Sequence, residues 1–191
     1  MKKYQIFLLC SLIIGSVSSS ANLLKKIEIK GDGCDNQYTA AETIPTRDQF
    51  QIPFRFLMNK SDSVSILRKA CQFTLPIHVG ANEKILIQKI EQKVSYQKKI
   101  GTNLDAFKLQ AQLEVFFAGK KGQDITLKEV FEKNKPIEDQ EKTLSADSAL
   151  ESACGQDLIL RGKFSAFAQG HRAMQLSSGD LILKYKVITC P

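Results

Sequence analysis

The placement of four cysteines constrains this chain more than any other feature of its sequence. Cys34, Cys71, Cys154 and Cys190 remain once a predicted N-terminal export signal, which contains Cys10, is removed. An exported chain with an even number of cysteines usually forms structural disulfides with them, rather than catalytic or metal sites. The sequence therefore predicts an exported, disulfide-stapled domain.

The start of the chain has the composition of a secretory signal peptide. Lys2 and Lys3 form a short positive region, an apolar stretch follows over residues 6–17, and small residues lead to Ala21. A signal peptidase reads small side chains at such positions, so we expect residues 1–21 to be removed. No apolar run approaches the ~20 residues that a membrane-spanning helix needs. The sequence predicts a secreted or periplasmic protein with no transmembrane segment after cleavage.

The mature chain is basic, which limits the classes of partner. Removal of Lys2 and Lys3 lowers the formal net charge from +7 to +5. A basic exported protein can meet anionic envelope polymers, phospholipid headgroups or nucleic acid. The lysines are scattered, and no run reaches the about five to eight basic residues that are typical of a nucleic-acid patch. The composition argues against nucleic acid. The scattered charge is typical of a solvated surface with an excess of lysine for solubility, and the partner classes left open are an anionic envelope polymer and a protein.

Alternating apolar and polar residues predict strands, because successive side chains of a strand point to opposite faces of a sheet. Pro53 lacks an amide donor, which predicts an edge position or a bulge. Ser178-Gly179-Asp180 predicts a turn before the last strand. The predicted strands cover residues 24–29, 50–58, 71–79, 85–96, 107–117, 158–167 and 181–189.

Two segments depart from this alternation. Leu127, Val130 and Phe131 follow one another at three- and four-residue spacing, which predicts a short helix. Residues 132–152 are polar and poor in apolar side chains, which predicts a long excursion with a helical turn. Overall, residues 22–191 are expected to form a single all-β domain, an antiparallel β-sandwich with one or two short helices, stapled by two disulfides.

Spacing alone does not give the disulfide pairing, because four cysteines allow three connectivities. We favour Cys34 with Cys71 and Cys154 with Cys190, since each bond then ties a loop or a strand end to a predicted strand. The sequence has no Cys-x-x-Cys pair and only two histidines. Neither a metal site nor a redox site is expected on these grounds, and no cofactor is predicted.

Few residues suggest a functional site. His171 and Arg172 are the candidate ligand-binding residues, because a loop histidine beside an arginine can engage an anion. His78 is expected on the outward face of a strand. Leu57 and Phe116 alternate outward, and apolar side chains exposed in this way would be contact points of a binding surface. No catalytic residue is predicted, since neither a Gly-x-Ser-x-Gly elbow nor a phosphate-binding Gly-rich loop is present.

The sequence around the cysteines is similar to that of a known family. Gly31-Asp32-Gly33-Cys34 resembles the Gly-x-Gly-Cys opening of the domain-of-unknown-function 4360 family, a group of small secreted proteins. Arg68-Lys69-Ala70-Cys71 is similar to the Arg-x-x-Cys segment of that family, and Cys154-Gly155 and Cys190 match its later cysteines. Asp35 replaces the proline that many members carry after the first cysteine. The resemblance implies export and a β-rich, disulfide-bonded domain, and it transfers no catalytic residue.

Two functions of different classes remain. The first is an exported, noncatalytic β-sandwich that binds an envelope polymer or a protein partner. The second is a secreted hydrolase that acts on polysaccharide, with paired carboxylates brought together from distant strands. Because an activity has to be argued from a site and the sequence displays none, the binding protein is favoured.

Overall fold

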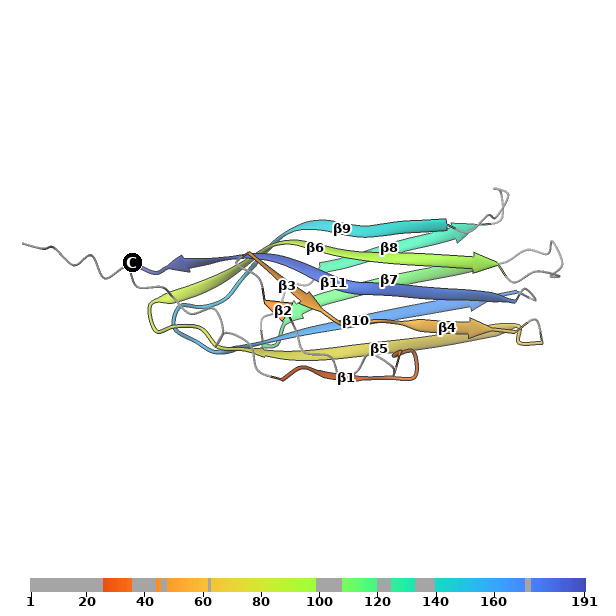
Figure 1. Cartoon of the computed structure of the whole chain (residues 1–191), viewed down its shortest axis with the longest axis horizontal. Coiled ribbons are helices and arrows are strands. Elements are labelled where there is room, and N and C mark those ends of the chain that lie inside the picture. Colours follow the sequence, from red (N-terminus) through yellow and green to blue (C-terminus); the bar gives the residue numbers. More distant parts are fainter. Residues whose placement is uncertain are drawn as a thin grey trace, which may run out of the picture.

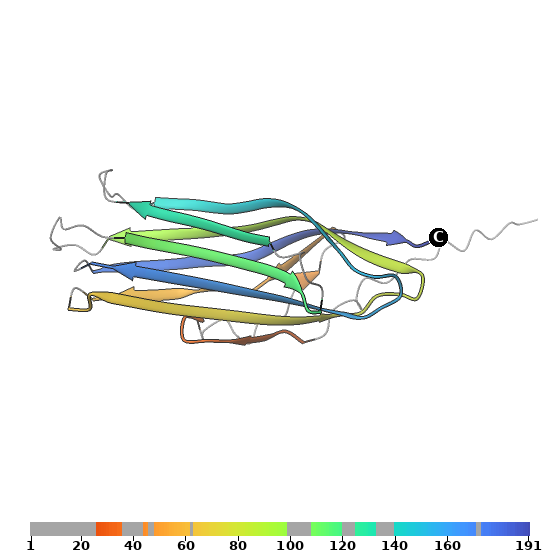
Figure 2. The ribbon, with the colours of Figure 1, turned by 180° about the vertical axis from the view of Figure 1, so that it is seen from behind.

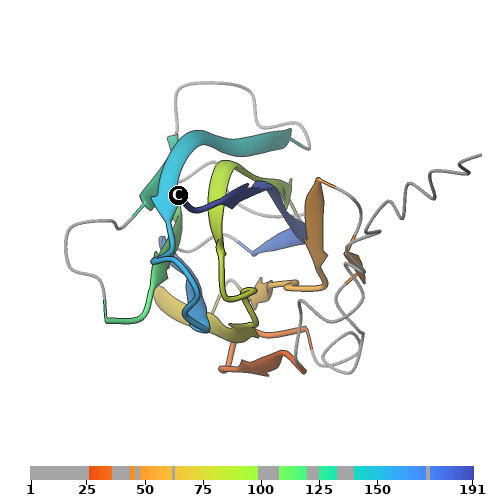
Figure 3. The same cartoon turned by 90° about the vertical axis from the view of Figure 1, so that its left-hand side faces the viewer.

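The fold is built from strands throughout the described part of the chain. The computed structural model describes residues 26–35, 44–45, 48–61, 63–98, 108–119, 125–132, 140–170 and 173–191. Across these residues the chain forms β-strands and no helix, and therefore no helix that could cross a bilayer. Figures 1 and 2 show opposite sides of an elongated sandwich, and Figure 3 views it along its length. The all-β prediction is confirmed; the predicted export signal lies outside the described residues.

The strands form two antiparallel sheets. The five-stranded sheet has the order β1 (Glu28–Lys30), β5 (Ile66–Ile77), β10 (Leu158–Gln169), β7 (Lys108–Phe117) and β8 (Ile125–Glu132). The six-stranded sheet contains β2 (Ile44–Pro45), β3 (Gln49–Ile52), β11 (Met174–Thr189), β6 (Glu83–Lys98) and β9 (Gln140–Glu151), and β4 (Leu57–Lys60) pairs with β11 beyond β3.

The hydrophobic core lies between the sheets and follows from the alternation in the sequence. In β5, for example, Cys71, Phe73 and Leu75 are fully buried, whereas the residues between them are not. Aromatic rings join the layers: Phe54 contacts Phe73 with ring centroids 4.9 Å apart, and Phe56 contacts Phe164 at 4.7 Å. A single cluster of buried apolar side chains spans both sheets.

The predicted helix at Leu127, Val130 and Phe131 is wrong, because residues 125–132 form strand β8. Here β8 pairs with β7 over its whole length, so the backbone groups that face β7 are satisfied by that ladder. Its side chains also alternate, with Leu127 packed against the core. The three- and four-residue spacing arose because Val130 sits on the outer face of an edge strand, where an apolar side chain is tolerated.

The helical turn predicted in residues 132–152 is also wrong, because residues 140–151 form strand β9. It pairs with β6 along the edge of the six-stranded sheet and buries Leu144 and Leu150. Lys142, on the inward side of β9, forms an ion pair with Glu129 of β8 and so links the two sheets along one side of the sandwich. An edge strand needs few apolar residues, so its composition resembles that of a loop.

The predicted strand over residues 50–58 is interrupted at Pro53, and its two parts, β3 and β4, both pair with β11. Opposite the break, β11 has a register shift between Ser178 and Leu181. Ser178 Oγ accepts a hydrogen bond from the Phe56 amide at 3.0 Å. The predicted turn at Ser178-Gly179-Asp180 is therefore wrong: these residues form an irregularity inside a continuous strand.

Candidate functional site

The disulfide pairing predicted from the sequence is confirmed, as Cys34 bonds to Cys71 and Cys154 to Cys190. The glycines before Cys34 permit a close approach to β5. Gly31 has a φ of 142°, and a Cβ atom there would lie 2.2 Å from the carbonyl oxygen of Ala70. At Gly33 a Cβ atom would lie 2.2 Å from the Phe56 ring. The Gly-x-Gly-Cys sequence is needed because the chain passes through a space with no room for side chains.

This glycine segment also fixes the backbone of Ala70. The Ala70 amide donates to Asp32 Oδ1 at 2.9 Å, and the Ala70 carbonyl oxygen accepts from the Gly33 amide at 2.9 Å. Lys69 Nζ donates to the Asp32 carbonyl oxygen at 2.8 Å. On its other side Ala70 pairs with Ser165 of β10. The edge of β5 is therefore held from both sides at this point.

The outer face of the five-stranded sheet is organised in rows of side chains by the register of its central strands. Arg68 of β5, Phe167 of β10 and Gln110 of β7 form one row. The next row consists of Ala70, Ser165 and Gln112, and the one after that of Gln72, Lys163 and Glu114. The middle row thus has small side chains on two adjacent strands, between rows of longer ones.

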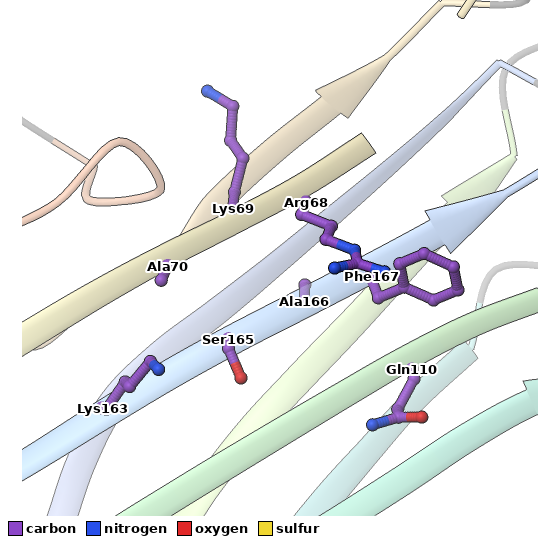
Figure 4. Close-up of a pocket in the computed structure, with 8 residues that line it drawn as sticks. All are labelled: Arg68, Lys69, Ala70, Gln110, Lys163, Ser165, Ala166 and Phe167. Atoms are coloured by element: carbon purple, nitrogen blue, oxygen red, sulfur yellow. The ribbon is translucent and has the colours of Figure 1, made fainter. Parts of the chain in front are cut away.

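A shallow depression lies over this middle row (Figure 4). Its volume is about 270 Å³. Along β10, Ser165 lies between Lys163 on one side and Phe167 on the other, and the Arg68 side chain extends toward Phe167 (Figure 4). The depression is lined by Arg68, Lys69, Ala70, Gln110, Lys163, Ser165, Ala166 and Phe167.

The charged groups on this face are mostly cations without carboxylate partners. The Arg68 guanidinium lies over the Phe167 ring, with its Cζ atom 5.1 Å from the ring centroid. Among the described residues, no ion pair involves Arg68, Arg161 or Lys163. Glu114, opposite Lys163 in the sheet, accepts a hydrogen bond from Gln112 at 2.6 Å. The cations at outward positions are Lys30, Arg68, Lys108, Lys128, Arg161 and Lys163, and carboxylates at outward positions include Glu28 and Glu114.

The outer face of the six-stranded sheet differs, because most of its charges are paired with one another, although no ion pair among the described residues involves Lys186. Arg55 Nε donates to Asp180 Oδ1 at 2.6 Å, and Gln51 Nε2 donates to Asp180 Oδ2 at 2.9 Å. Partial burial would raise the pKa of Asp180, but these hydrogen bonds and the charge of Arg55 outweigh it and hold the pKa below its usual value. The other ion pairs are Lys84–Glu151, Lys89–Glu91, Lys93–Glu141 and Lys184–Glu91.

The residues that the sequence singled out do not form this depression. His171 and Arg172 lie outside the described residues. His78 is exposed, as expected, and its Nδ1 lies 2.5 Å from Asp157 Oδ1 at the other end of β5. Leu57 and Phe116 are half-buried and belong to different sheets. Within the described part of the chain, no group of three or more His, Cys, Asp or Glu side chains is placed to hold a metal ion.

Sequence reasoning missed the depression because it depends on register. Arg68 and Ala70 were noted only as part of the Arg-x-x-Cys segment, and Ser165 and Gln110 lie on strands far from them in sequence. The one available signal was the small outward residue, Ser165, within a strand whose other outward residues are large. This signal predicts a depression only when it is known that β5, with Ala70 opposite Ser165, lies beside β10.

Comparisons with known proteins identify a family but no activity. The family described as a domain of unknown function, DUF4360, matches residues 22–181, which confirms the resemblance seen in the sequence. No curated protein sequence matches the chain.

Similar solved structures include TmCBM61 in complex with β-1,4-galactotriose, at 11% identity and a TM-score of 0.26, covering 88% of this chain and 92% of that one. The mannan-recognising carbohydrate-binding module TmCBM27 has 8% identity and a TM-score of 0.32, covering 86% and 97%. The CBM22-1 xylan-binding domain from Paenibacillus barcinonensis Xyn10C has 11% identity and a TM-score of 0.26, covering 73% and 86%. Likenesses of this size do not assign a ligand to the present chain.

Proposed function

We propose that this chain, which belongs to the DUF4360 family, is an exported, noncatalytic protein that binds an anionic polymer of the cell envelope. Membership of that family assigns no activity to the chain. Binding takes place on the outer face of the five-stranded sheet. The single observation that carries the proposal is the contrast in charge pairing between the outer faces of the two sheets.

Unpaired cations on a rigid sheet are typical of a surface that meets an anionic partner. A protein that uses charge only for solubility gains nothing from keeping like charges together, because they repel one another. Arg68, Arg161 and Lys163 lie on adjacent strands β5 and β10, within reach of one extended ligand. A polymer supplies many weak contacts along such a surface, and their sum gives useful affinity without a deep pocket.

Export is supported by the two disulfides, since such bonds persist in oxidising compartments. A basic surface on an exported protein encounters the anionic polymers of the envelope, so we propose such a polymer as the partner. The depression is lined by cations, an amide and small side chains, and no carboxylate lines it. Because glycoside cleavage uses a pair of carboxyl groups, this lining fits a noncatalytic role.

Affinity electrophoresis of the exported, oxidised protein tests this proposal. The gels contain polygalacturonate, poly(glycerol phosphate) or the neutral polymer dextran. We expect retardation in the anionic gels and none in dextran, and retardation should weaken as NaCl rises from about 20 mM to about 500 mM, because salt screens exposed charges. Absence of retardation in both anionic gels at low salt would overturn the proposal.

Matched variants locate the surface. Arg161→Gln with Lys128→Gln removes two exposed cations from the five-stranded face, and Lys93→Gln with Lys186→Gln removes two from the six-stranded face. Both pairs change the net charge equally. For the first pair we expect the polymer concentration that gives half-maximal retardation to rise about tenfold. For the second pair it should change by less than about twofold. An equal loss from both pairs would show that net charge, rather than this face, is responsible.

A further inference from the structure

We infer that the depression on the five-stranded sheet is a subsite for a carboxylate-bearing sugar unit, so that the polymer is an acidic polysaccharide. This inference depends on the proposed function and names the ligand class of the same surface. It is carried by the arrangement of Arg68, of the small side chains of Ala70 and Ser165, which form the floor of the depression, and of Lys163.

The position and the chemistry of Arg68 suit the binding of a carboxylate. A guanidinium presents its N–H groups in one plane, in a fork that matches the two oxygens of a carboxylate. The Phe167 ring, 5.1 Å from the guanidinium, supports Arg68 from below. A guanidinium that lies over the face of a ring keeps those N–H groups that point away from the ring available for a ligand. Arg68 has no ion-pair partner among the described residues, so a ligand carboxylate displaces no existing ion pair.

The floor of the depression suits a sugar ring. Ala70 and Ser165 are the smallest outward side chains in their part of the sheet, and they are neighbours across β5 and β10. Ser165 offers a hydroxyl and Gln110 an amide, and such groups both donate to and accept from sugar hydroxyls. The volume of about 270 Å³ lies just below the range of about 300–1,000 Å³ that is usual for pockets that enclose a drug-sized ligand. A single ring-sized unit is the matching size.

Lys163 extends the subsite along the polymer. The rise of ~3.4 Å per residue puts the Cα atoms of Lys163 and Phe167 ~14 Å apart, so cations border both ends of the floor. With Arg68 on the carboxylate of the bound unit, Lys163 is placed for the charge of a neighbouring unit. A phosphate chain would use the same cations but not the floor, because it has no ring to occupy it.

Variants of Ser165 and of Arg68 separate recognition of the sugar ring from recognition of charge. Ser165→Leu fills the floor without changing charge, and Ser95→Leu makes the same change at a half-buried position on the other sheet. Arg68→Lys keeps the charge but removes the planar set of N–H donors of the guanidinium, and Arg55→Lys makes the same change on the outer face of the six-stranded sheet. Titration calorimetry measures the affinity of each variant for polygalacturonate and for poly(glycerol phosphate), and thermal unfolding verifies that each variant is folded.

We expect Ser165→Leu and Arg68→Lys each to weaken polygalacturonate binding by about tenfold or more, the size expected for loss of a charge-assisted contact. The poly(glycerol phosphate) affinity of Ser165→Leu, and both affinities of each control variant, should change by less than about twofold. Arg68→Lys should weaken poly(glycerol phosphate) binding as well, because a guanidinium also binds phosphate through two N–H groups. Galacturonate should compete for polygalacturonate binding, and galactose should not. If both polymers bind the wild type equally and Ser165→Leu changes neither affinity, the inference fails and the proposed function stands. If the wild type binds neither polymer, both fail.

Discussion

The outer faces of the two sheets both carry many charged side chains, yet they use them differently. On the six-stranded sheet, lysines and Arg55 lie next to carboxylates, as in the pairs Arg55–Asp180 and Lys93–Glu141. On the five-stranded sheet, Arg68 and Lys163 border a depression with no such partners among the described residues. The two faces belong to one sandwich and share one core. The difference teaches that the pairing of charges, rather than their number, distinguishes the two faces, and the proposed binding surface rests on that distinction.

The largest effect should come from the disulfide that supports the five-stranded face. Cys34→Ala with Cys71→Ala opens a loop of 37 residues, and Cys154→Ala with Cys190→Ala opens one of 36. Chain entropy predicts a loss of ~3–4 kcal/mol in unfolding free energy for either pair. The first pair should cost more, because Cys71 is fully buried and Ala leaves a gap in the core. Urea unfolding measures both losses.

The same variants distinguish the faces by binding. Loss of the Cys34–Cys71 bond frees the segment that holds Ala70, so polymer retardation should weaken at temperatures where the variant is still folded. Loss of the Cys154–Cys190 bond, which fastens the end of β11, should leave retardation unchanged. Equal retardation of both variants and the wild type would mean that the depression needs no such support.

An intermediate effect should follow from removing one arginine from each face. Arg55→Ala should lower the unfolding free energy by about 1–2 kcal/mol, because it breaks the partly buried pair with Asp180. Arg68→Ala should change that free energy by less than about 0.5 kcal/mol while weakening polymer binding. A comparable loss of stability in both variants would contradict the distinction between the faces.

Acid should remove the Arg55 effect. The pKa of Asp180 is lower in the folded protein than in the unfolded chain, so the pair stabilises the fold above the unfolded value of about 3.9, and this stabilisation is lost as pH falls through the folded value. The advantage of the wild type over Arg55→Ala should therefore be constant from neutral pH to about pH 5 and shrink below about pH 4. Thermal unfolding across this pH range provides the measurement.

The smallest effect should come from exposed lysines. Lys93→Gln breaks a pair with Glu141 in which both side chains are exposed, and should cost about 0.2–1 kcal/mol. Lys163→Gln removes a cation with no ion-pair partner among the described residues, and should leave stability within about 0.5 kcal/mol or raise it slightly by relieving repulsion from Arg161. A clear loss of stability in Lys163→Gln would show that this cation serves the fold.

Most of the fold could be predicted from the sequence, and the reasons for the misses are physical. Two-residue alternation identified β5, β7 and β10 because each buries one face completely, and β11 in part. The edge strands β8 and β9 were missed. An edge strand has one neighbour and a partly solvated surface, so the polar segment of β9 and the spaced apolar residues of β8 carried signals typical of loops and helices.

The candidate site was less accessible to sequence reasoning than the fold. The positions of the cysteines in loops and strands predicted both disulfides, whereas the close approach of the Gly31–Cys34 segment to β5 was not predicted. The depression, however, depends on the pairing of Ala70 with Ser165, residues 95 positions apart. A one-residue change in that register would turn Ser165 to the core side, and no local pattern of either strand specifies which strand is its neighbour.

The Cys34–Cys71 bond has a consequence for when the protein can act. The Gly31–Cys34 segment is hydrogen-bonded to Ala70, and the disulfide also ties it covalently to β5. In a reducing compartment both cysteines remain thiols, and only the hydrogen bonds are left to hold the segment. On the proposed function, oxidation after export would fix the surface beside the depression, so that the protein would bind most tightly in the compartment that contains the polymer.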